Sequence, residues 1–174
     1  KFVDEVDVIF QAGNGFGGKA SFYPGWKSGP DGGDGGSGGN IYITVSSDLT
    51  ALNKFMGVNT RKAQDGQPGS NYRKSGRNGK DITLNLPTGS ILTDQNTGEI
   101  IELNDTNQKI LICKGGQGGR GTYALRSPGN TTPLKGEAGK PGQKRNLKIV
   151  LKLIADYGLI GLPNAGKSSL LNAL

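Results

Sequence analysis

The sequence predicts a mainly β protein in which a bundle of glycine-rich polyproline II helices projects from a small antiparallel β-sandwich or barrel. The truncated start of an α/β domain is expected to follow. Three observations predict this architecture: glycine recurs with a period of three, short apolar segments separate the glycine runs, and the β pattern ends near Ala155. We therefore expect one domain over residues 1–154 and a second over residues 155–174.

The glycine runs predict the bundle. They are Gly29, Gly32, Gly35 and Gly38 with Gly33, Gly36 and Gly39; Gly115, Gly118 and Gly121 with Gly116 and Gly119; Gly136, Gly139 and Gly142; and the pairs Gly66/Gly69 and Gly76/Gly79. A period of three matches the polyproline II helix, in which every third residue lies on one edge. An edge of glycine allows close approach of a neighbouring segment, so we expect the runs to pair through their backbones. The alternative is a set of flexible glycine linkers.

The segments between the runs predict seven or eight short strands. Their apolar residues alternate or are continuous over Val3–Phe10, Ile41–Val45, Ile82–Leu86, Ile91–Thr93, Ile100–Leu103, Ile110–Cys113 and Leu147–Leu153. Turn residues between Thr93 and Ile100 predict a hairpin, and only Leu49–Met56 is typical of a short helix.

Composition limits the function classes. Only 33% of the 174 residues are hydrophobic and 31 are glycine, so the apolar core must be small. The absence of histidine and the single cysteine exclude disulfides, zinc clusters and histidine catalysis as main themes. We interpret Cys113 as a buried strand residue. No apolar run reaches membrane-spanning length, and we expect a cytoplasmic monomer.

Charge is unevenly distributed along the chain, whose net charge is +7. Residues 53–80 contain seven basic residues against Asp65 alone: Lys54, Arg61, Lys62, Arg73, Lys74, Arg77 and Lys80. Such a block suits a phosphate backbone. A solvated basic loop without a partner is the alternative, because Tyr72 is the only interleaved aromatic residue.

A phosphate-binding motif lies in the last fourteen residues. Gly161–Ser168 fits G-x-x-x-x-G-K-[ST], with a buried-strand pattern before it and a helical pattern after it. Lys167 is expected to reach the β and γ phosphates and Ser168 to ligate Mg²⁺. The predicted nucleotide contacts are Gly161, Leu162, Pro163, Asn164, Ala165, Gly166, Lys167, Ser168 and Ser169. A glycine turn beside a surface lysine is the alternative.

Hydrolysis needs more than this loop. An acidic residue for the metal, a group that places the attacking water and elements that sense the γ phosphate are also required. We find none of them after the loop within the 174 residues. We therefore expect these 174 residues alone to bind nucleotide poorly and to hydrolyse none.

Together the motifs resemble the Obg GTPases over essentially the whole chain. The specific pieces are Phe2–Asp4, Gly29–Gly36, Gly76–Gly79, Leu86–Gly89, Gly115–Gly121 and Leu153–Ser168. The resemblance implies a cytoplasmic protein that binds GTP and GDP, hydrolyses GTP slowly and associates with the large ribosomal subunit in assembly or stress. It also implies a projection that reaches ribosomal RNA near the peptidyl-transferase region, and Asn164 as a residue able to help hold K⁺. Binding of the alarmone ppGpp is left open.

One stretch departs from the family. After Phe22, where the family carries a short basic run, this chain has Tyr23-Pro24-Gly25-Trp26-Lys27. We hypothesise that Tyr23 or Trp26 replaces charge with stacking on RNA, a proline turn with packed aromatics being the alternative. The candidate RNA or ribosome contacts are Tyr23, Trp26, Lys27, Arg73, Lys74, Arg77, Lys80 and Arg120.

These observations leave three hypotheses about function. The first is a GTPase switch, and the second is a module that binds ribosomal RNA or protein. The third is a glycine-rich binding or structural module without a nucleotide-dependent role, which the loop, the basic block and the strands disfavour.

Overall fold

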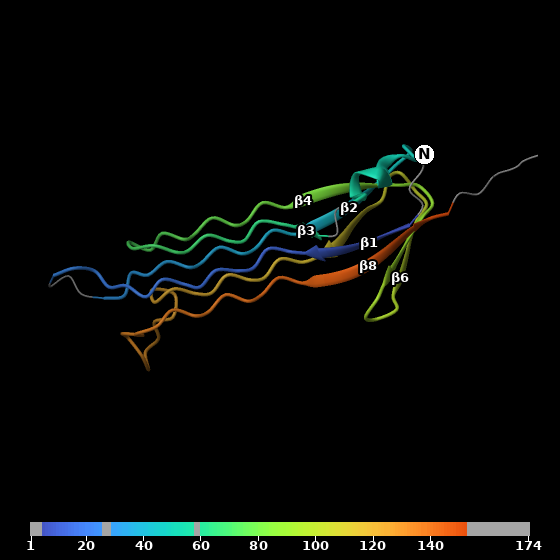
Figure 1. Ribbon diagram of the computed structural model, residues 1–174. Coiled ribbons are helices and arrows are strands. Elements are labelled where there is room, and N and C mark those ends of the chain that lie inside the picture. Colours follow the sequence, from blue (N-terminus) through green and yellow to red (C-terminus); the bar gives the residue numbers. More distant parts are fainter. Residues whose placement is uncertain (1–4, 26–28, 58–59, 153–174) are drawn as a thin grey trace, which may run out of the picture.

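The computed structural model describes residues 5–25, 29–57 and 60–152 (Figure 1). The predicted mainly β fold is confirmed, because the described residues form two sheets and a single 3₁₀ helix, η1 (Ala51–Phe55). The larger sheet has the order β3-β1-β8-β5-β6 and the smaller β4-β2-β7. The strands are β1 (Glu5–Gln11), β2 (Ile41–Ser46), β3 (Thr60–Lys62), β4 (Ile82–Pro87), β5 (Ser90–Asp94), β6 (Ile100–Leu103), β7 (Lys109–Cys113) and β8 (Lys144–Leu151).

Both sheets are mixed, so the prediction of antiparallel sheets is wrong. β1 pairs with β3 in parallel and β2 pairs with β4 in parallel, whereas the remaining pairs are antiparallel. The reason is the path of the chain. It leaves the sheets after β1, β3 and β7, runs out along the glycine-rich region, and returns into β2, β4 and β8 (Figure 1). Strands that leave share one direction and strands that return share the other.

Local predictions within the sandwich are confirmed. β5 and β6 form the expected antiparallel hairpin, and the expected short helix is η1. Strand β3 was not predicted, because its sequence Thr60-Arg61-Lys62 contains no apolar residue and so no alternating pattern.

The hydrophobic core lies in the sandwich. In β2 the residues Ile41, Ile43 and Val45 point inward and alternate with less buried neighbours, as one buried sheet face requires. Phe10 is fully buried and meets Phe55 of η1 edge to face at 6.5 Å between ring centroids. Cys113 is buried in β7 as predicted, and burial raises the pKa of its thiol to about 11.

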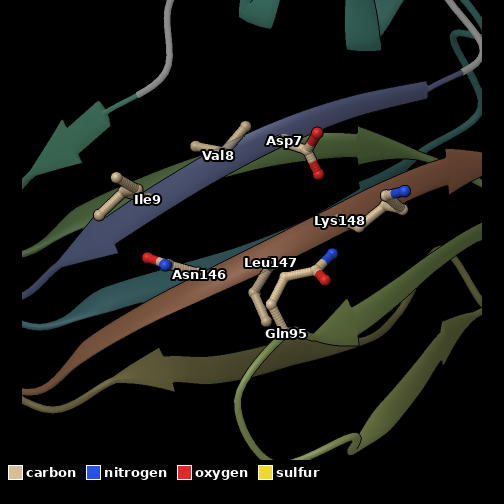
Figure 2. Close-up of a pocket in the computed structure, with 7 residues that line it drawn as sticks. All are labelled: Asp7, Val8, Ile9, Gln95, Asn146, Leu147 and Lys148. Carbon is tan, nitrogen blue, oxygen red and sulfur yellow. The ribbon is translucent and has the colours of Figure 1, made fainter.

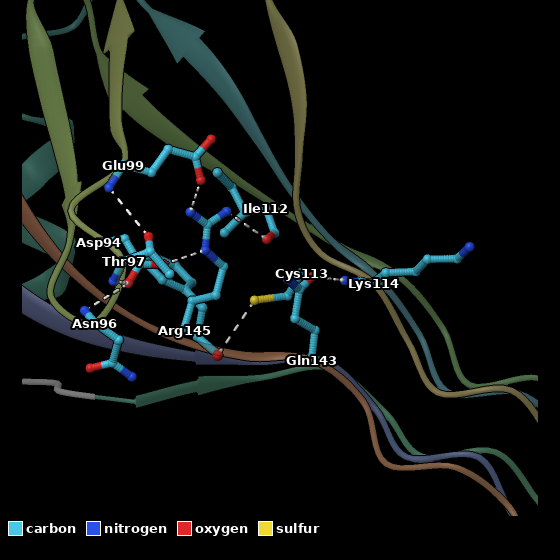
Figure 3. A network of polar contacts seen from close by, with 10 residues as sticks. Asp94, Asn96, Thr97, Glu99, Ile112, Cys113, Lys114, Gln143 and Arg145 are labelled. Atoms are coloured by element: carbon cyan, nitrogen blue, oxygen red, sulfur yellow. Dashed lines mark hydrogen bonds and ion pairs between the residues drawn. The ribbon is translucent and has the colours of Figure 1, made fainter.

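An ion-pair network, in which Arg145 and Asp94 are largely buried and Glu99 is exposed, fixes the β5–β6 hairpin to the sandwich (Figure 3). Arg145 of β8 donates to the Asp94 carboxylate over 2.9 Å and to the Glu99 carboxylate over 2.6 Å. Its other terminal nitrogen donates to the Ile112 carbonyl over 3.3 Å. The hydrogen bond from Arg145, with those from the Asn96 and Thr97 backbone, lowers the pKa of Asp94.

Six extended segments that belong to no helix or strand project from one end of the sheets (Figure 1). We number them in chain order: segment 1 (residues 12–21), segment 2 (30–40), segment 3 (63–70), segment 4 (74–81), segment 5 (114–122) and segment 6 (136–143). Segments 2 to 6 contain the glycine runs found in the sequence except for Gly29, which precedes segment 2. Segment 1, with Gly15 and Gly18, was not singled out, because its four glycines keep no sustained period.

Backbone hydrogen bonds join the segments at every third residue. The N–H groups of Gly33, Gly36 and Gly39 donate to segment 3 over 2.8 to 2.9 Å, and those of Gly35 and Gly38 donate to segment 5 over 2.8 Å. Segment 2 also accepts hydrogen bonds from segments 1 and 4, so it is the centre of the bundle. The alternative of flexible glycine linkers is therefore wrong for these residues.

Close approach explains the glycines. A Cβ atom on Gly36 would lie 1.9 Å from the carbonyl oxygen of Arg77, and one on Gly118 would lie 2.0 Å from that of Gly35. Both distances are far inside van der Waals contact. The segments can pair at this separation only because the side chain is missing.

Candidate nucleic-acid interface

A cluster of aromatic and guanidinium groups lies at the end of the bundle, where the chain turns between segments. We call Tyr23, Tyr72, Arg73, Tyr123 and Arg126 the tip cluster. Arg73 donates from Nε to the Tyr23 hydroxyl over 2.9 Å and from Nη1 to the Tyr123 hydroxyl over 2.8 Å. The guanidinium carbons of Arg73 and Arg126 lie 4.4 Å and 3.7 Å from the centroid of the Tyr123 ring. Two cations therefore share one aromatic ring.

The backbone that presents this cluster is held by Asp31. Tyr72 and Arg73 have left-handed backbone angles, with φ of 57° and 63°, which is uncommon for residues other than glycine. Asp31 is only 1% exposed as a residue, and its carboxylate accepts hydrogen bonds from the Ser21 hydroxyl over 2.5 Å and from the Tyr72 N–H over 2.8 Å. These hydrogen bonds lower the pKa of Asp31. A buried charge thus stabilises a strained turn with an exposed tyrosine.

Acidic and basic side chains in the bundle have different surroundings. Residues 12–22, 29–40, 63–81 and 114–143 contain ten lysines and arginines but five aspartates and glutamates. Each of the five carboxylates accepts a hydrogen bond from a backbone N–H of another segment or turn, as Asp34 does from Gly121 over 2.8 Å. All ten basic residues are exposed. The acidic groups therefore join segments, while the basic groups give the surface its charge.

The predicted basic block is not one surface. Lys62 pairs with Asp65 over 2.6 Å. Arg61 stacks on Phe55 at 4.9 Å and donates to the Lys54 carbonyl over 2.9 Å. These residues belong to the sandwich and its junction with the bundle, and only Arg73, Lys74, Arg77 and Lys80 extend along the projection.

The predicted RNA contacts therefore fall into separate groups. Tyr23 and Arg73 meet at the tip, whereas Lys74, Arg77 and Lys80 follow segment 4. Arg120 of segment 5 is paired with Glu137 of segment 6 over 3.2 Å. Trp26 and Lys27 lie outside the described residues, as does the predicted nucleotide loop from Gly161 to Ser169.

Sequence reasoning missed part of the tip cluster. Tyr123 and Arg126 lie about 50 residues from Arg73 in the chain and form no basic block, so only the pairing of segments brings them together. The adjacent pair Tyr72-Arg73, an aromatic residue beside a basic one, was the available local signal. No local sequence pattern predicts that Asp31 accepts the hydrogen bonds that fix the turn at Tyr72 and Arg73.

A different cavity, of about 400 Å³, lies over the paired strands β1 and β8 of the sandwich (Figure 2). It is lined by Asp7, Ile9, Asn146 and Lys148, with Gln95 from the β5–β6 turn. Its mixed charges give no preference for an anion. Among the described residues no cluster of histidine, cysteine, aspartate or glutamate could hold a metal ion, and no described helix is long and apolar enough to span a membrane.

The fold and this surface define a class: a β-sandwich protein with a basic projection built from backbone. A family model described as GTP1/OBG matches residues 3–153, which is most of the chain. The chain belongs to this family, and the matched region is its glycine-rich N-terminal domain. The resemblance drawn from the motifs is confirmed.

Proposed function

We propose that this chain comes from a GTP-binding switch that acts on the large ribosomal subunit, and that its glycine bundle recognises ribosomal RNA. The single observation that carries this proposal is the arrangement of charge on the bundle. Ten exposed basic side chains cover a narrow projection whose carboxylates all accept hydrogen bonds from backbone N–H groups. Such a surface suits a phosphate backbone, and such a shape suits a crevice in folded RNA.

The nucleotide part of the proposal rests on family membership and on the motif. Lys167 would bind the β and γ phosphates of GTP, Ser168 would ligate Mg²⁺, and Asn164 would help hold K⁺. Slow GTP hydrolysis would then control association with the ribosome, and the protein would act as a cytoplasmic monomer during ribosome assembly or stress. The division into residues 1–154 and 155–174 belongs to the same proposal.

We also infer that the six segments are polyproline II helices. Hydrogen bonds recur at every third residue, and the segments are neither helix nor strand. The glycines at the segment contacts avoid the left-handed region that turn glycines such as Gly25 and Gly98 adopt. Three residues per turn places every third residue against the same neighbour.

Co-sedimentation with purified large ribosomal subunits across a salt series tests the RNA-binding proposal. Binding through phosphates releases counterions, so the affinity should fall by a factor of about 10³ or more between 50 and 200 mM salt if six or more phosphates are contacted. Absence of binding at 50 mM salt, or binding that salt does not change, would overturn the proposal.

Calorimetric titration with GTP and Mg²⁺ tests the separate expectation for the nucleotide loop. The 174-residue chain should give no binding heat at micromolar nucleotide, because the elements that complete such a site lie beyond the loop in P-loop proteins. Micromolar affinity would contradict that expectation without affecting the RNA-binding proposal.

A further inference from the structure

We propose that the groove between segments 3 and 4 is a binding track for the phosphate backbone of a single RNA strand, with Lys74, Arg77 and Lys80 as its phosphate contacts. This inference rests on the proposed RNA-binding function and assigns that function to one flank of the bundle. It is distinct from the tip cluster, which lies where the segments turn.

The groove has a volume of about 720 Å³ and is lined from segment 3 by Gln64 and Gln67 and from segment 4 by Lys74, Arg77 and Lys80. All five side chains are exposed. No aspartate or glutamate is among the residues that line it. The groove therefore differs from the mixed cavity on the sandwich, in which Asp7 faces the same space as Lys148.

Two amide side chains of the groove, Gln64 and Asn78, are oriented as donors. The side-chain oxygen of Gln64 accepts the Lys80 N–H over 2.8 Å, and that of Asn78 accepts the Ser37 N–H over 2.9 Å. Each amide oxygen is thus engaged with the backbone, which leaves the NH₂ group to donate outward. Lysine and arginine are also donors only, so the groove favours a ligand rich in acceptor oxygens.

The three cations have no partner among the described side chains. Other basic residues are satisfied within the protein: Lys62 by Asp65, Arg120 by Glu137, and Arg145 by Asp94 and Glu99. By contrast, the charged groups of Lys74, Arg77 and Lys80 form no hydrogen bond or ion pair with any residue that the structure describes. They remain available to an external anion.

Their spacing forms a line. Lys74, Arg77 and Lys80 are each three residues apart on an extended segment, so the Cα atoms of neighbouring members are at most about 11 Å apart. A second groove of about 760 Å³ shares Asn78 and Lys80 with the first and adds Lys114 of segment 5. It is also lined by Asp81, whose carboxylate accepts the Asn40 N–H over 2.7 Å. A linear row of cations beside a narrow groove fits one extended strand, which carries one phosphate per nucleotide.

The test compares two variants of the 174-residue chain that carry equal charge changes. The track variant is K74Q/R77Q/K80Q. The control is K19Q/K135Q/K140Q, whose three lysines are also exposed. Lys19 lies on segment 1, Lys135 directly precedes segment 6, and Lys140 lies on segment 6. Segment 6 forms backbone hydrogen bonds with segments 1 and 5 and none with segment 4 in the described chain. The probes are a fluorescent twelve-nucleotide oligouridylate and, for charge alone, polyglutamate of similar length.

The track variant should bind oligouridylate with an affinity reduced about a hundredfold at 100 mM salt, and the slope of log affinity against log salt should fall by about 2. In the control variant, the slope of log affinity against log salt should change by less than a third of that amount. Equal losses in the two variants would overturn the track while leaving RNA binding intact. Tighter binding of polyglutamate than of RNA would also overturn it, in favour of an acidic protein partner. Unchanged circular dichroism spectra would show that both variants fold.

Discussion

The β-sandwich and the glycine bundle are stabilised by opposite means. In the sandwich, side chains such as Phe10, Ile43 and Ile149 are fully buried and fill the space between two sheets. In the bundle, segments are joined by regular backbone hydrogen bonds, and the contact positions are occupied by glycine. The same chain therefore contains one region in which side-chain volume stabilises and one in which side-chain volume is excluded.

This difference explains how a protein with so little apolar sequence forms a long projection. Backbone N–H and C=O groups that leave water must find partners, and each segment of the bundle provides them to its neighbours. Most side chains of the bundle can therefore face the solvent, and its lysine and arginine side chains are exposed. A projection of this kind presents charge densely because few of its side chains are needed to join the segments.

The largest expected effect is loss of volume in the sandwich. Phe10→Ala should reduce the free energy of unfolding by about 3 to 5 kcal/mol, because a fully buried ring in contact with Phe55 leaves a cavity. Denaturant unfolding measures this change. Ile100→Ala is the matched control, because Ile100 is 64% exposed and should change stability by less than about 0.5 kcal/mol. Equal effects would contradict a core between the sheets.

In the bundle, by contrast, adding side-chain volume at a glycine should be destabilising. Gly36→Ala adds one methyl group that would meet a backbone carbonyl at 1.9 Å, which should cost about 3 kcal/mol and accelerate amide hydrogen exchange in segments 2 and 4. Gly17→Ala is the control, because its Cβ would meet no atom closer than 3.5 Å. If both variants were equally stable, close segment packing would not be the reason for glycine.

The ion pair in the sandwich should give a stability that depends on pH. The pKa of Asp94 is lowered by folding, so its contribution is fully present above the unfolded value of about 3.9 and is lost as pH falls through the folded value. Asp94→Asn should therefore reduce stability by about 2 kcal/mol at pH 7, and the difference from the wild type should close below pH 4. Chemical unfolding at several pH values measures it. Glu102→Gln, at an exposed site in β6, is the control and should change stability by less than about 0.5 kcal/mol at pH 7.

The smallest effect is expected at the exposed pair between segments 5 and 6. Arg120→Gln removes an ion pair whose side chains are 59% and 46% exposed, so water and salt screen the attraction and the melting temperature should hardly change. Any small decrease should disappear at high salt in thermal unfolding. A large decrease in melting temperature would show that this side-chain pair, rather than the backbone, joins segments 5 and 6.

The sequence predicted the elements well and their arrangement poorly. Strands such as Ile41–Ser46 carry an alternating pattern that the core requires, and the hairpin between β5 and β6 follows from local turn residues. The parallel pairs β1–β3 and β2–β4 were not predictable from any window, because they result from the three excursions of the chain along the bundle.

The candidate interface divides in the same way. The basic residues Lys74, Arg77 and Lys80 were identified from a local excess of charge. The tip cluster was found only in part, because Tyr123 and Arg126 reach Arg73 from another excursion. The basic block also included Arg61 and Lys62, whose charges are engaged within the sandwich and its junction.

By itself the sequence determined the mainly β fold, the glycine-built bundle and membership of the family, because periodicity and motifs are local properties of the chain. Only the tertiary structure decided which segments pair, that Asp31 holds a strained turn, and that acidic groups join segments while basic groups face outward. The physical reason is that a hydrogen bond between segments depends on which backbone lies alongside, and glycine carries no side chain that could specify that partner.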